Sequence, residues 1–322
     1  MPFSDIQNPG LAAFQSAVTA PADFDDFWQA TLTDARSHGT AMTVDPVDGP
    51  VALFDTYDVT FPGFAGDPVR GWLVLPKMRT GKLPLVVEYV GYGGGRGLSH
   101  EKLHWPSLGY AYFRMDTRGQ GSTWSKGDTA DPHGSDPAHP GYMTRGIQSP
   151  ATYYYRRLFT DAVRAIDCLT ARPEIDGGKV AVVGGSQGGG IALAAAALQG
   201  SVGALMPDVP YLCDFPRAVR VALRDPFLEI ARYLAVHRDR TAQVFATTAY
   251  FDGVNMARRC TMPALMSVAL MDDICPPSTV YGAFNALRSA DKTMLEYEFN
   301  NHEGGGAFQE AAQLTWLKAR FG

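Results

Sequence analysis

A serine, two adjacent aspartates and a histidine follow one another in the order that acyl transfer by a nucleophilic serine requires. Ser186 stands in the glycine-rich stretch Gly184–Gly188, Asp272 and Asp273 come later, and His302 lies near the end of the chain. A serine hydroxyl needs a base beside it, and the base needs an acid that orients it. Of the seven histidines, only His302 has this order and context. These residues predict a Ser-His-Asp site.

The flanks of Ser186 are those of a tight turn between a strand and a helix. Lys179–Val183 is a β-branched apolar run that predicts a buried strand, and Gly189–Leu198 is rich in good helix formers. A G-x-S-x-G motif in this setting is the nucleophile elbow of the α/β-hydrolase fold. Only small neighbours fit around such a turn, and the helix that follows directs its first N–H groups at the site.

The rest of the chain supplies the elements that this fold needs. Phe24–Ala30 predicts an amphipathic helix, and Thr56–Phe61 with Val69–Leu75 predicts an antiparallel hairpin. Strands then alternate with helices, which predicts an α/β fold with a mostly parallel central sheet and antiparallel N-terminal strands. The further strands are expected at Leu85–Val90, Tyr110–Met115, Ala204–Met206, Ala264–Leu270 and Met294–Phe299, and further helices at Thr160–Thr170 and Phe308–Leu317.

Two segments interrupt this alternation. Residues 121–151 are rich in Gly, Pro, Asp and His, which predicts a long ordered loop near the site. Residues 214–259 are mostly helical and charged, and their position suits a helical cap over the pocket. We expect a single α/β-hydrolase domain over residues 1–322, with 214–259 as a cap insertion.

The acid and the base both follow predicted strands. Open α/β sheets place their ligands at the carboxyl ends of strands, where Asp272 and His302 are expected. Asp272 and Asp273 are neighbours that point in opposite directions, so only one can reach His302. On this reasoning the choice between them stays open.

The oxyanion hole should use the N–H of the residue after the nucleophile, which is Gln187. A second donor is expected from the loop after an early strand, and Gly91–Gly95 follows the strand that ends at Val90. Its glycines let the backbone approach a substrate closely. The main-chain N–H of Tyr92 is the best candidate.

Composition narrows the class of protein. A net charge of −5 over 322 residues gives no reason to expect nucleic acid or an anionic membrane as partner. The first residues lack the features of a signal peptide, and no apolar run is long enough to span a bilayer, so we expect a cytoplasmic protein. The four cysteines, none in a metal-type pair, are expected as buried thiols: Cys168, Cys213, Cys260 and Cys275.

Two motifs point to other chemistry and are interpreted as coincidental. His100–His104 matches the H-E-x-x-H zinc signature, but a glycine and a Trp-Pro pair leave barely two helical turns around it. The glycine clusters do not match G-x-G-x-x-G in register, so no dinucleotide site is expected. We therefore predict neither a metal nor a cofactor.

Taken together, the motifs resemble carbohydrate esterase family 7, the acetyl xylan esterase and cephalosporin C deacetylase group. The family's RGQ, GxSQG and terminal HE motifs match Arg118–Gln120, Gly184–Gly188 and His302–Glu303. Longer stretches that also resemble the family are Tyr153–Arg157, Tyr250–Asn255 and Cys275–Val280.

The resemblance implies a Ser186–Asp272–His302 triad with an oxyanion hole from Tyr92 and Gln187. It implies removal of acetyl groups from small substrates, xylo-oligosaccharides and cephalosporin C, by a cytoplasmic hexamer. Arg118 and Gln120 are expected to hold loops, because a buried arginine in a hydrogen-bond network explains the RGQ motif as well as catalysis does. Candidates for the acyl pocket are Tyr211, Pro226 and Ile274.

Three alternatives stay open. A serine peptidase of the prolyl oligopeptidase type shares the elbow but usually carries an N-terminal β-propeller, for which we expect no room here. A general short-chain carboxylesterase would use the same triad. A hydrolase fold used only for binding would be expected to have lost one of the three residues.

Overall fold

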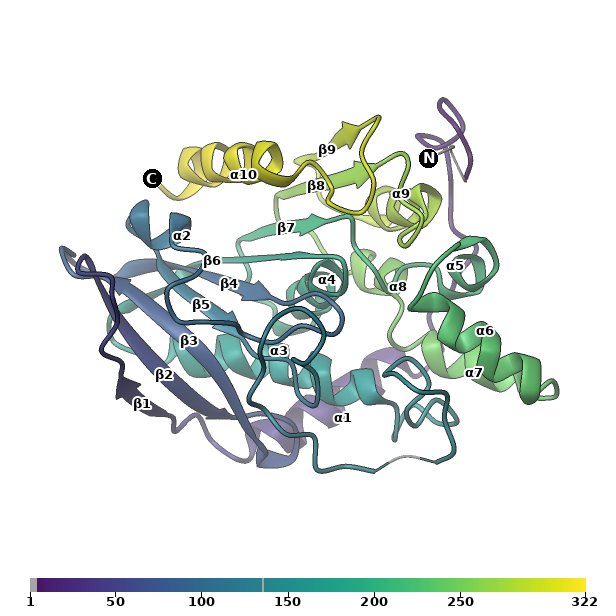
Figure 1. The fold of residues 1–322 in the computed structure, drawn as a ribbon, viewed down its shortest axis with the longest axis horizontal. Coiled ribbons are helices and arrows are strands. Elements are labelled where there is room, and N and C mark those ends of the chain that lie inside the picture. Colours follow the sequence, from purple (N-terminus) through teal and green to yellow (C-terminus); the bar gives the residue numbers. More distant parts are fainter. Residues whose placement is uncertain (1–4, 135) are drawn as a thin grey trace.

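A nine-stranded sheet forms the centre of the computed structural model, which describes residues 5–134 and 136–322 (Figure 1). The strand order is β1-β2-β3-β5-β4-β6-β7-β8-β9. The pairs β1–β2, β2–β3 and β3–β5 are antiparallel, and all later pairs are parallel. The strands are β1 (Thr43–Pro46), β2 (Phe54–Pro62), β3 (Pro68–Pro76), β4 (Leu83–Tyr89), β5 (Ala111–Met115), β6 (Ile175–Gly185), β7 (Ala204–Asp208), β8 (Ala264–Ala269) and β9 (Lys292–Tyr297).

The predicted antiparallel start is confirmed. β2 and β3 pair from Phe54 opposite Pro76 to Pro62 opposite Pro68, and a short 3-10 turn, η1 (Phe64–Gly66), joins them. The predicted parallel sheet is also confirmed, with β6, the strand before Ser186, between β4 and β7. A mixed sheet of this kind with flanking helices is an α/β-hydrolase fold.

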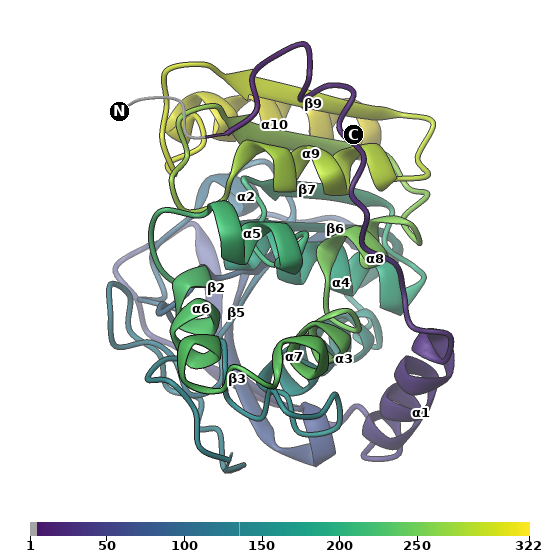
Figure 2. The ribbon, with the colours of Figure 1, turned by 90° about the vertical axis from the view of Figure 1, so that its right-hand side faces the viewer.

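Helices cover both faces of the sheet (Figures 1 and 2). One face carries α1 (Phe24–Arg36), α3 (Tyr154–Thr170), α4 (Gln187–Gln199), α8 (Gly253–Ala257) and α9 (Pro277–Ala286). The other face carries α2 (His104–Ser107) and α10 (Gly306–Phe321). Helix α3 begins at Tyr154, earlier than the predicted Thr160, because Tyr154 and Tyr155 of its first turn are wholly buried in the core.

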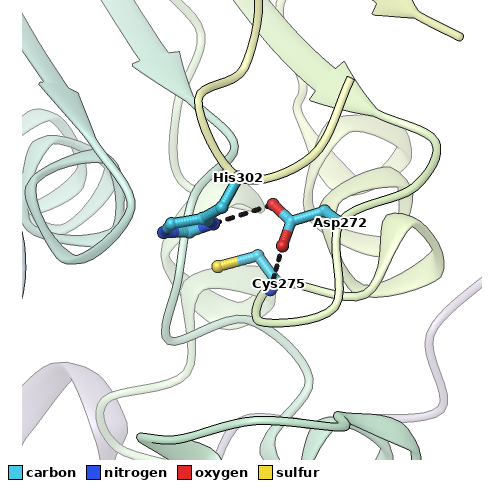
Figure 3. A group of neighbouring side chains, drawn as sticks. All are labelled: Asp272, Cys275 and His302. Atoms are coloured by element: carbon cyan, nitrogen blue, oxygen red, sulfur yellow. Dashed lines mark hydrogen bonds and ion pairs between the residues drawn. The ribbon is translucent and has the colours of Figure 1, made fainter. Parts of the chain in front are cut away.

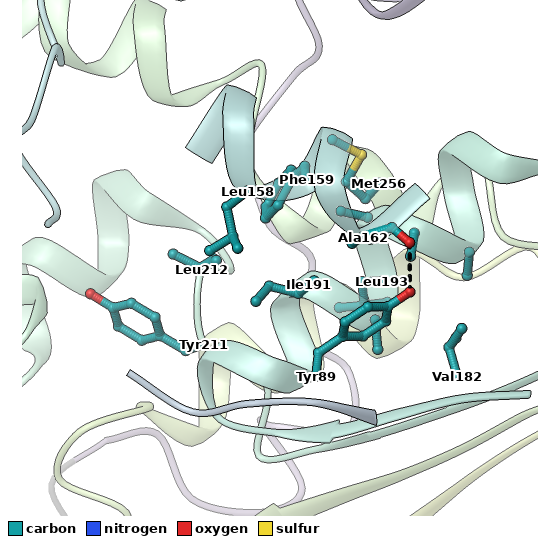
Figure 4. Close-up of a cluster of buried hydrophobic side chains, with 14 of the residues drawn as sticks. Tyr89, Leu158, Phe159, Ala162, Val182, Ile191, Leu193, Tyr211, Leu212 and Met256 are labelled. Carbon is teal, nitrogen blue, oxygen red and sulfur yellow. Dashed lines mark hydrogen bonds between the residues drawn. The ribbon is translucent and has the colours of Figure 1, made fainter. Parts of the chain in front are cut away.

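Apolar side chains of β4 point alternately to the two faces of the sheet, so helices must cover both faces. Leu85, Val87 and Tyr89 belong to the larger buried cluster, on the face of α3 and α4, whereas Val86 belongs to the cluster against α2 and α10. Figure 4 shows the larger cluster around Tyr89, whose hydroxyl donates a 3.0 Å hydrogen bond to the carbonyl of Ala162 in α3. This packing fixes the end of β4, which precedes the loop of the predicted oxyanion hole.

Residues 214–259 contain helices, as predicted. They are α5 (Phe215–Val221), α6 (Phe227–Val236), α7 (Thr241–Thr248) and α8, and Figure 1 shows α5 to α7 beyond the carboxyl ends of the central strands. The loop predicted over 121–151 has neither helix nor strand among its described residues. Within the ranges that the structure describes, no helix combines the length and the apolar character needed to cross a bilayer.

Candidate active site

Ser186 occupies a strained turn between β6 and α4. Its backbone has φ 55° and ψ −121°, a conformation that L-residues rarely adopt. Two hydrogen bonds hold it there, because the Ser186 N–H donates to the carbonyl of Asp208 and its carbonyl accepts from the N–H of Tyr211, each at 2.9 Å. The end of β7 and the segment that follows it therefore hold Ser186 in this strained conformation.

The glycines of the motif are not equivalent. A Cβ on Gly188 would lie 2.1 Å from the carbonyl oxygen of Tyr89, and a Cβ on Gly184 would lie 2.4 Å from the carbonyl carbon of Gly188. Both contacts are with backbone, which cannot move aside cheaply. Gly185 has open space at its Cβ position. The first and last glycines of G-x-S-x-G are therefore steric requirements of the turn.

His302 is hydrogen-bonded to Asp272, not to Asp273. Its Nδ1 lies 2.8 Å from Oδ2 of Asp272 (Figure 3), and the other carboxylate oxygen accepts the N–H groups of Ile274 and Cys275, each at 2.8 Å. The Asp272 carboxylate is thereby fixed from both sides and has no exposed surface. With Nδ1 engaged, Nε2 is the imidazole nitrogen left free to act on a substrate.

The side chain of Asp273 has a different partner. Its Oδ2 lies 3.8 Å from the guanidinium of Arg224, and its carbonyl accepts two N–H groups of the 223–224 segment. Sequence reasoning could not choose between the neighbours, because both follow β8. The turn in which Asp272 accepts two N–H groups orients that side chain toward His302.

Cys275 places a thiol among these groups. Figure 3 shows its Sγ next to the imidazole of His302, and its side chain is within hydrogen-bonding reach of Ser186. Burial raises the pKa of the Cys275 thiol well above its ordinary value, and the contact with Ser186 opposes this rise. The donor atoms of Asp272, Cys275 and His302 lie within 4.8 Å of one another, but a metal ion there would have to displace the hydrogen bond between His302 and Asp272.

The loop that carries Tyr92 is held by two glutamine side chains. Gln187 donates from Nε2 to the carbonyl of Val90 at 3.2 Å, and Gln120 accepts the N–H of Gly93 at 2.6 Å. The two side chains also bond to each other, Gln120 Nε2 to Gln187 Oε1, at 3.0 Å. The backbone on both sides of Tyr92 is therefore fixed relative to the first residue of α4.

Arg118 lies in a network of ion pairs. Its wholly buried guanidinium makes a bidentate pair with Asp161 of α3, at 2.6 and 2.8 Å, and also binds Asp67 at 2.9 Å. Bidentate geometry of this kind is what arginine provides and lysine does not. The arginine thus fastens the segment that bears Gln120 to α3.

A cavity of about 580 Å³ opens beside Ser186 and His302. Of the three residues proposed for the acyl pocket, Pro226 and Ile274 line it. Tyr211 does not, because its side chain is wholly buried with its ring against Phe227, at a centroid distance of 4.1 Å. Tyr211 therefore stands behind the wall of the cavity.

Two residues that contact the site were not found from the sequence. Glu229 of α6 accepts a 2.6 Å hydrogen bond from the Tyr92 hydroxyl and a 3.0 Å bond from the N–H of Met143. Trp124 lines the cavity and donates from Nε1 to the carbonyl of Tyr92 at 2.8 Å. No pattern marks Glu229, whereas Trp124 is a large aromatic residue in an otherwise polar loop, a signal that could have been noticed.

The residues of the H-E-x-x-H match do not share a helix. His100 lies in a turn, and α2 begins only at His104. The glutamate between them, Glu101, binds Arg114 at 2.9 Å. The four cysteines are buried and free, as expected.

The sheet, the elbow and the residues around it define an α/β-hydrolase, and comparison with known proteins gives the family. The model of the acetyl xylan esterase (AXE1) family matches residues 1–320. The acetyl esterase Axe7A of Xylanibacter ruminicola is 30% identical over 307 residues, which cover 92% of this chain and 67% of that protein. The chain therefore belongs to the acetyl xylan esterase family and is a carboxylic ester hydrolase.

Solved structures agree with this assignment. An acetyl xylan esterase from Paenibacillus sp. R4 superimposes with a TM-score of 0.93 at 38% identity, and acetyl xylan esterase 1 from Thermoanaerobacterium sp. with 0.89 at 30%. Each comparison covers 98% of this chain and 99% of the other. An acylaminoacyl peptidase from Pyrococcus horikoshii shares the fold alone. It is 15% identical, with a TM-score of 0.59, and the match covers 41% of the peptidase chain. The peptidase alternative is not favoured.

Proposed function

We propose that Ser186, His302 and Asp272 form the catalytic triad of an esterase that removes acetyl groups from small O-acetylated saccharides. The observation that carries the proposal is the hydrogen bond between His302 and Asp272, in a cavity that also contains the strained Ser186. The reaction needs no metal and no cofactor.

In this mechanism the Ser186 hydroxyl attacks the acetyl carbonyl while Nε2 of His302 takes its proton. Asp272, bonded to Nδ1, holds the tautomer that leaves Nε2 free and stabilises the imidazolium that forms. The alcohol then leaves with the proton from His302. Water, deprotonated by the same imidazole, attacks the acetyl-serine and releases acetate.

The N–H groups of Tyr92 and Gln187 are the proposed oxyanion hole. A single such donor typically contributes about 3 kcal/mol to the transition state. The bonds of Gln120 and Gln187 to the loop on both sides of Tyr92 support this role, because they fix the donors before substrate arrives. Pre-positioned donors lose nothing to reorganisation during the reaction.

The acyl end of the cavity is proposed to be lined by Pro226 and Ile274, with Tyr211 supporting it from behind. Cephalosporin C deacetylation, a hexameric assembly and a cytoplasmic location are further proposals that rest on the family resemblance. So is the division of the chain into one α/β-hydrolase domain with residues 214–259 as its cap. Light scattering on the purified protein tests the assembly, and acetate release from cephalosporin C tests that activity.

The test of the function is a series of p-nitrophenyl esters, acetate, butyrate and octanoate, with and without a serine-directed inhibitor. Inhibitor-sensitive turnover that falls steeply with chain length is expected. Ser186→Ala should lower kcat by about a millionfold while the protein stays folded. Preference for octanoate would instead indicate a lipase-like carboxylesterase, and residual hydrolysis comparable to wild type in Ser186→Ala would refute the nucleophile.

A further inference from the structure

The cavity is much larger than an acetyl group requires. A volume of about 580 Å³ lies in the range of pockets that enclose drug-sized ligands. Beyond Ser186 and His302 it continues over the carboxyl ends of β4 and β5 to the first turns of α10, past Glu88, Arg114 and Glu310. Most of its volume is therefore available to the alcohol part of the ester.

Trp124 presents an aromatic surface to this space. The residue is 59% exposed, although tryptophan is on average highly buried in folded proteins. A Cβ built on Gly94 would lie 2.3, 2.6 and 2.9 Å from three consecutive ring atoms of Trp124. Such similar distances place Gly94 against the face of the indole, not its edge. Because one face rests on Gly94, the exposed surface belongs to the other.

This ring is close to the nucleophile. A Cβ on Gly91 would lie 3.4 Å from the Trp124 ring and 3.7 Å from the carbonyl oxygen of Gly185, the residue before Ser186. The indole and the elbow thus flank the same glycine. The hydrogen bond from Nε1 to the carbonyl of Tyr92 fixes the ring in this orientation.

Charged side chains along the cavity offer hydrogen-bonding groups to a ligand. Five carboxyl groups face two cationic side chains among the described residues that line the cavity. Both cations are already paired, Lys102 with Glu310 at 2.6 Å and Arg114 with Glu101 at 2.9 Å. Hydroxyl groups of a ligand can donate to the carboxylates and accept from the cations.

We propose that the open face of Trp124 is the stacking platform for a sugar ring on the alcohol side of the ester. The inference rests on the proposed esterase function and goes beyond it by naming the residue that recognises the alcohol. The C–H groups of a pyranose carry a partial positive charge that the negative face of an aromatic ring attracts. Stacking would also cover the exposed indole.

The test compares Trp124→Ala and Trp124→Phe with wild type on two substrates, an acetylated xylobiose and ethyl acetate, which has no ring. Trp124→Ala should lower the ratio of kcat/KM for the saccharide to that for ethyl acetate about tenfold, near the lower end of what removing an aromatic stacking partner costs for nucleobases. Trp124→Phe keeps a flat ring but loses the N–H, so this ratio should fall less than about threefold. Because the side chain is exposed, both variants should fold.

A uniform loss on both substrates in Trp124→Ala would overturn the proposal, because it would mean that the indole only holds the Tyr92 carbonyl. Failure of the esterase function itself would look different, as absent turnover of ethyl acetate by wild type.

Discussion

Glu229 couples α6 to the proposed oxyanion hole, and Glu229→Gln tests that coupling. The carboxylate accepts one hydrogen bond on each oxygen, from the Tyr92 hydroxyl and from the N–H of Met143. The Tyr92 hydroxyl in turn accepts the N–H of Tyr142 at 2.6 Å. A glutamine side chain offers only one acceptor oxygen, so one of the two donors would face an NH2 group.

The expected magnitude follows from this mismatch. A buried donor left without an acceptor costs about 1–3 kcal/mol. Glu229 is 6% exposed, so water cannot easily replace the missing acceptor. If the Tyr92 side chain moves to relieve the mismatch, the main-chain N–H of Tyr92 moves with it. Complete loss of one oxyanion-hole donor costs about 3 kcal/mol. We therefore expect kcat on p-nitrophenyl acetate to fall by about 5- to 30-fold, the equivalent of about 1–2 kcal/mol.

A matched control and a double-mutant cycle distinguish this coupling from general destabilisation. Glu296 accepts a hydrogen bond from Tyr281 away from the cavity, so Glu296→Gln should leave kcat unchanged. In a Tyr92→Phe background, Glu229→Gln should lower kcat less than about twofold, because the hydrogen bond between the Tyr92 hydroxyl and Glu229 is already absent. A lowered Tm with unchanged kcat in Glu229→Gln, or fully additive effects in the cycle, would refute the reasoning.

Other perturbations give distinct outcomes. Asp272→Asn should lower kcat by about 10⁴-fold, whereas Asp273→Asn should change it only a few-fold; equal losses in steady-state assays would contradict the assignment of the acid. Burial raises the pKa of Asp208 to about 7, so the folded state binds this proton more tightly than the unfolded state. The protonated Asp208 stabilises the folded state at low pH. This stabilisation is lost as pH rises from about 4 to 7, which lowers the free energy of unfolding by up to about 4 kcal/mol. Asp208→Asn should flatten urea-unfolding free energies over this window, and an unchanged slope would contradict the shift. Gly188→Ala should destabilise the fold by about 1–3 kcal/mol through its clash with the last carbonyl of β4, while Gly185→Ala, with open space, should barely shift the thermal midpoint; similar midpoints for the two would refute the steric argument.

The parts of the fold that the sequence could predict are those set by local patterns. Alternating apolar segments and the glycines around Ser186 indicate the strands, the elbow and the order of the site residues, because periodicity and turn chemistry act over a few positions. The start of α3 was harder to predict, since its first turn is stabilised by burial of Tyr154 and Tyr155 in the core.

What the sequence could not predict depends on contacts between distant segments. The bond between Tyr92 and Glu229 spans 137 positions, and that between Trp124 and Tyr92 spans 32. The choice of Asp272 over Asp273 depends on a turn that only the three-dimensional structure displays. Tyr211, proposed for the acyl pocket by resemblance, lies behind the wall because its ring packs on Phe227.

In the proposed mechanism Ser186 carries the acetyl group during turnover, and this intermediate can be trapped. The enzyme would be quenched with acid during turnover of p-nitrophenyl acetate, digested, and analysed by mass spectrometry. One acetyl group is expected on the peptide that contains Ser186, and none on the same peptide of Ser186→Ala. An acetyl group on Cys275, whose thiol is within hydrogen-bonding reach of Ser186, or rapid turnover without any acetylated peptide, would contradict it.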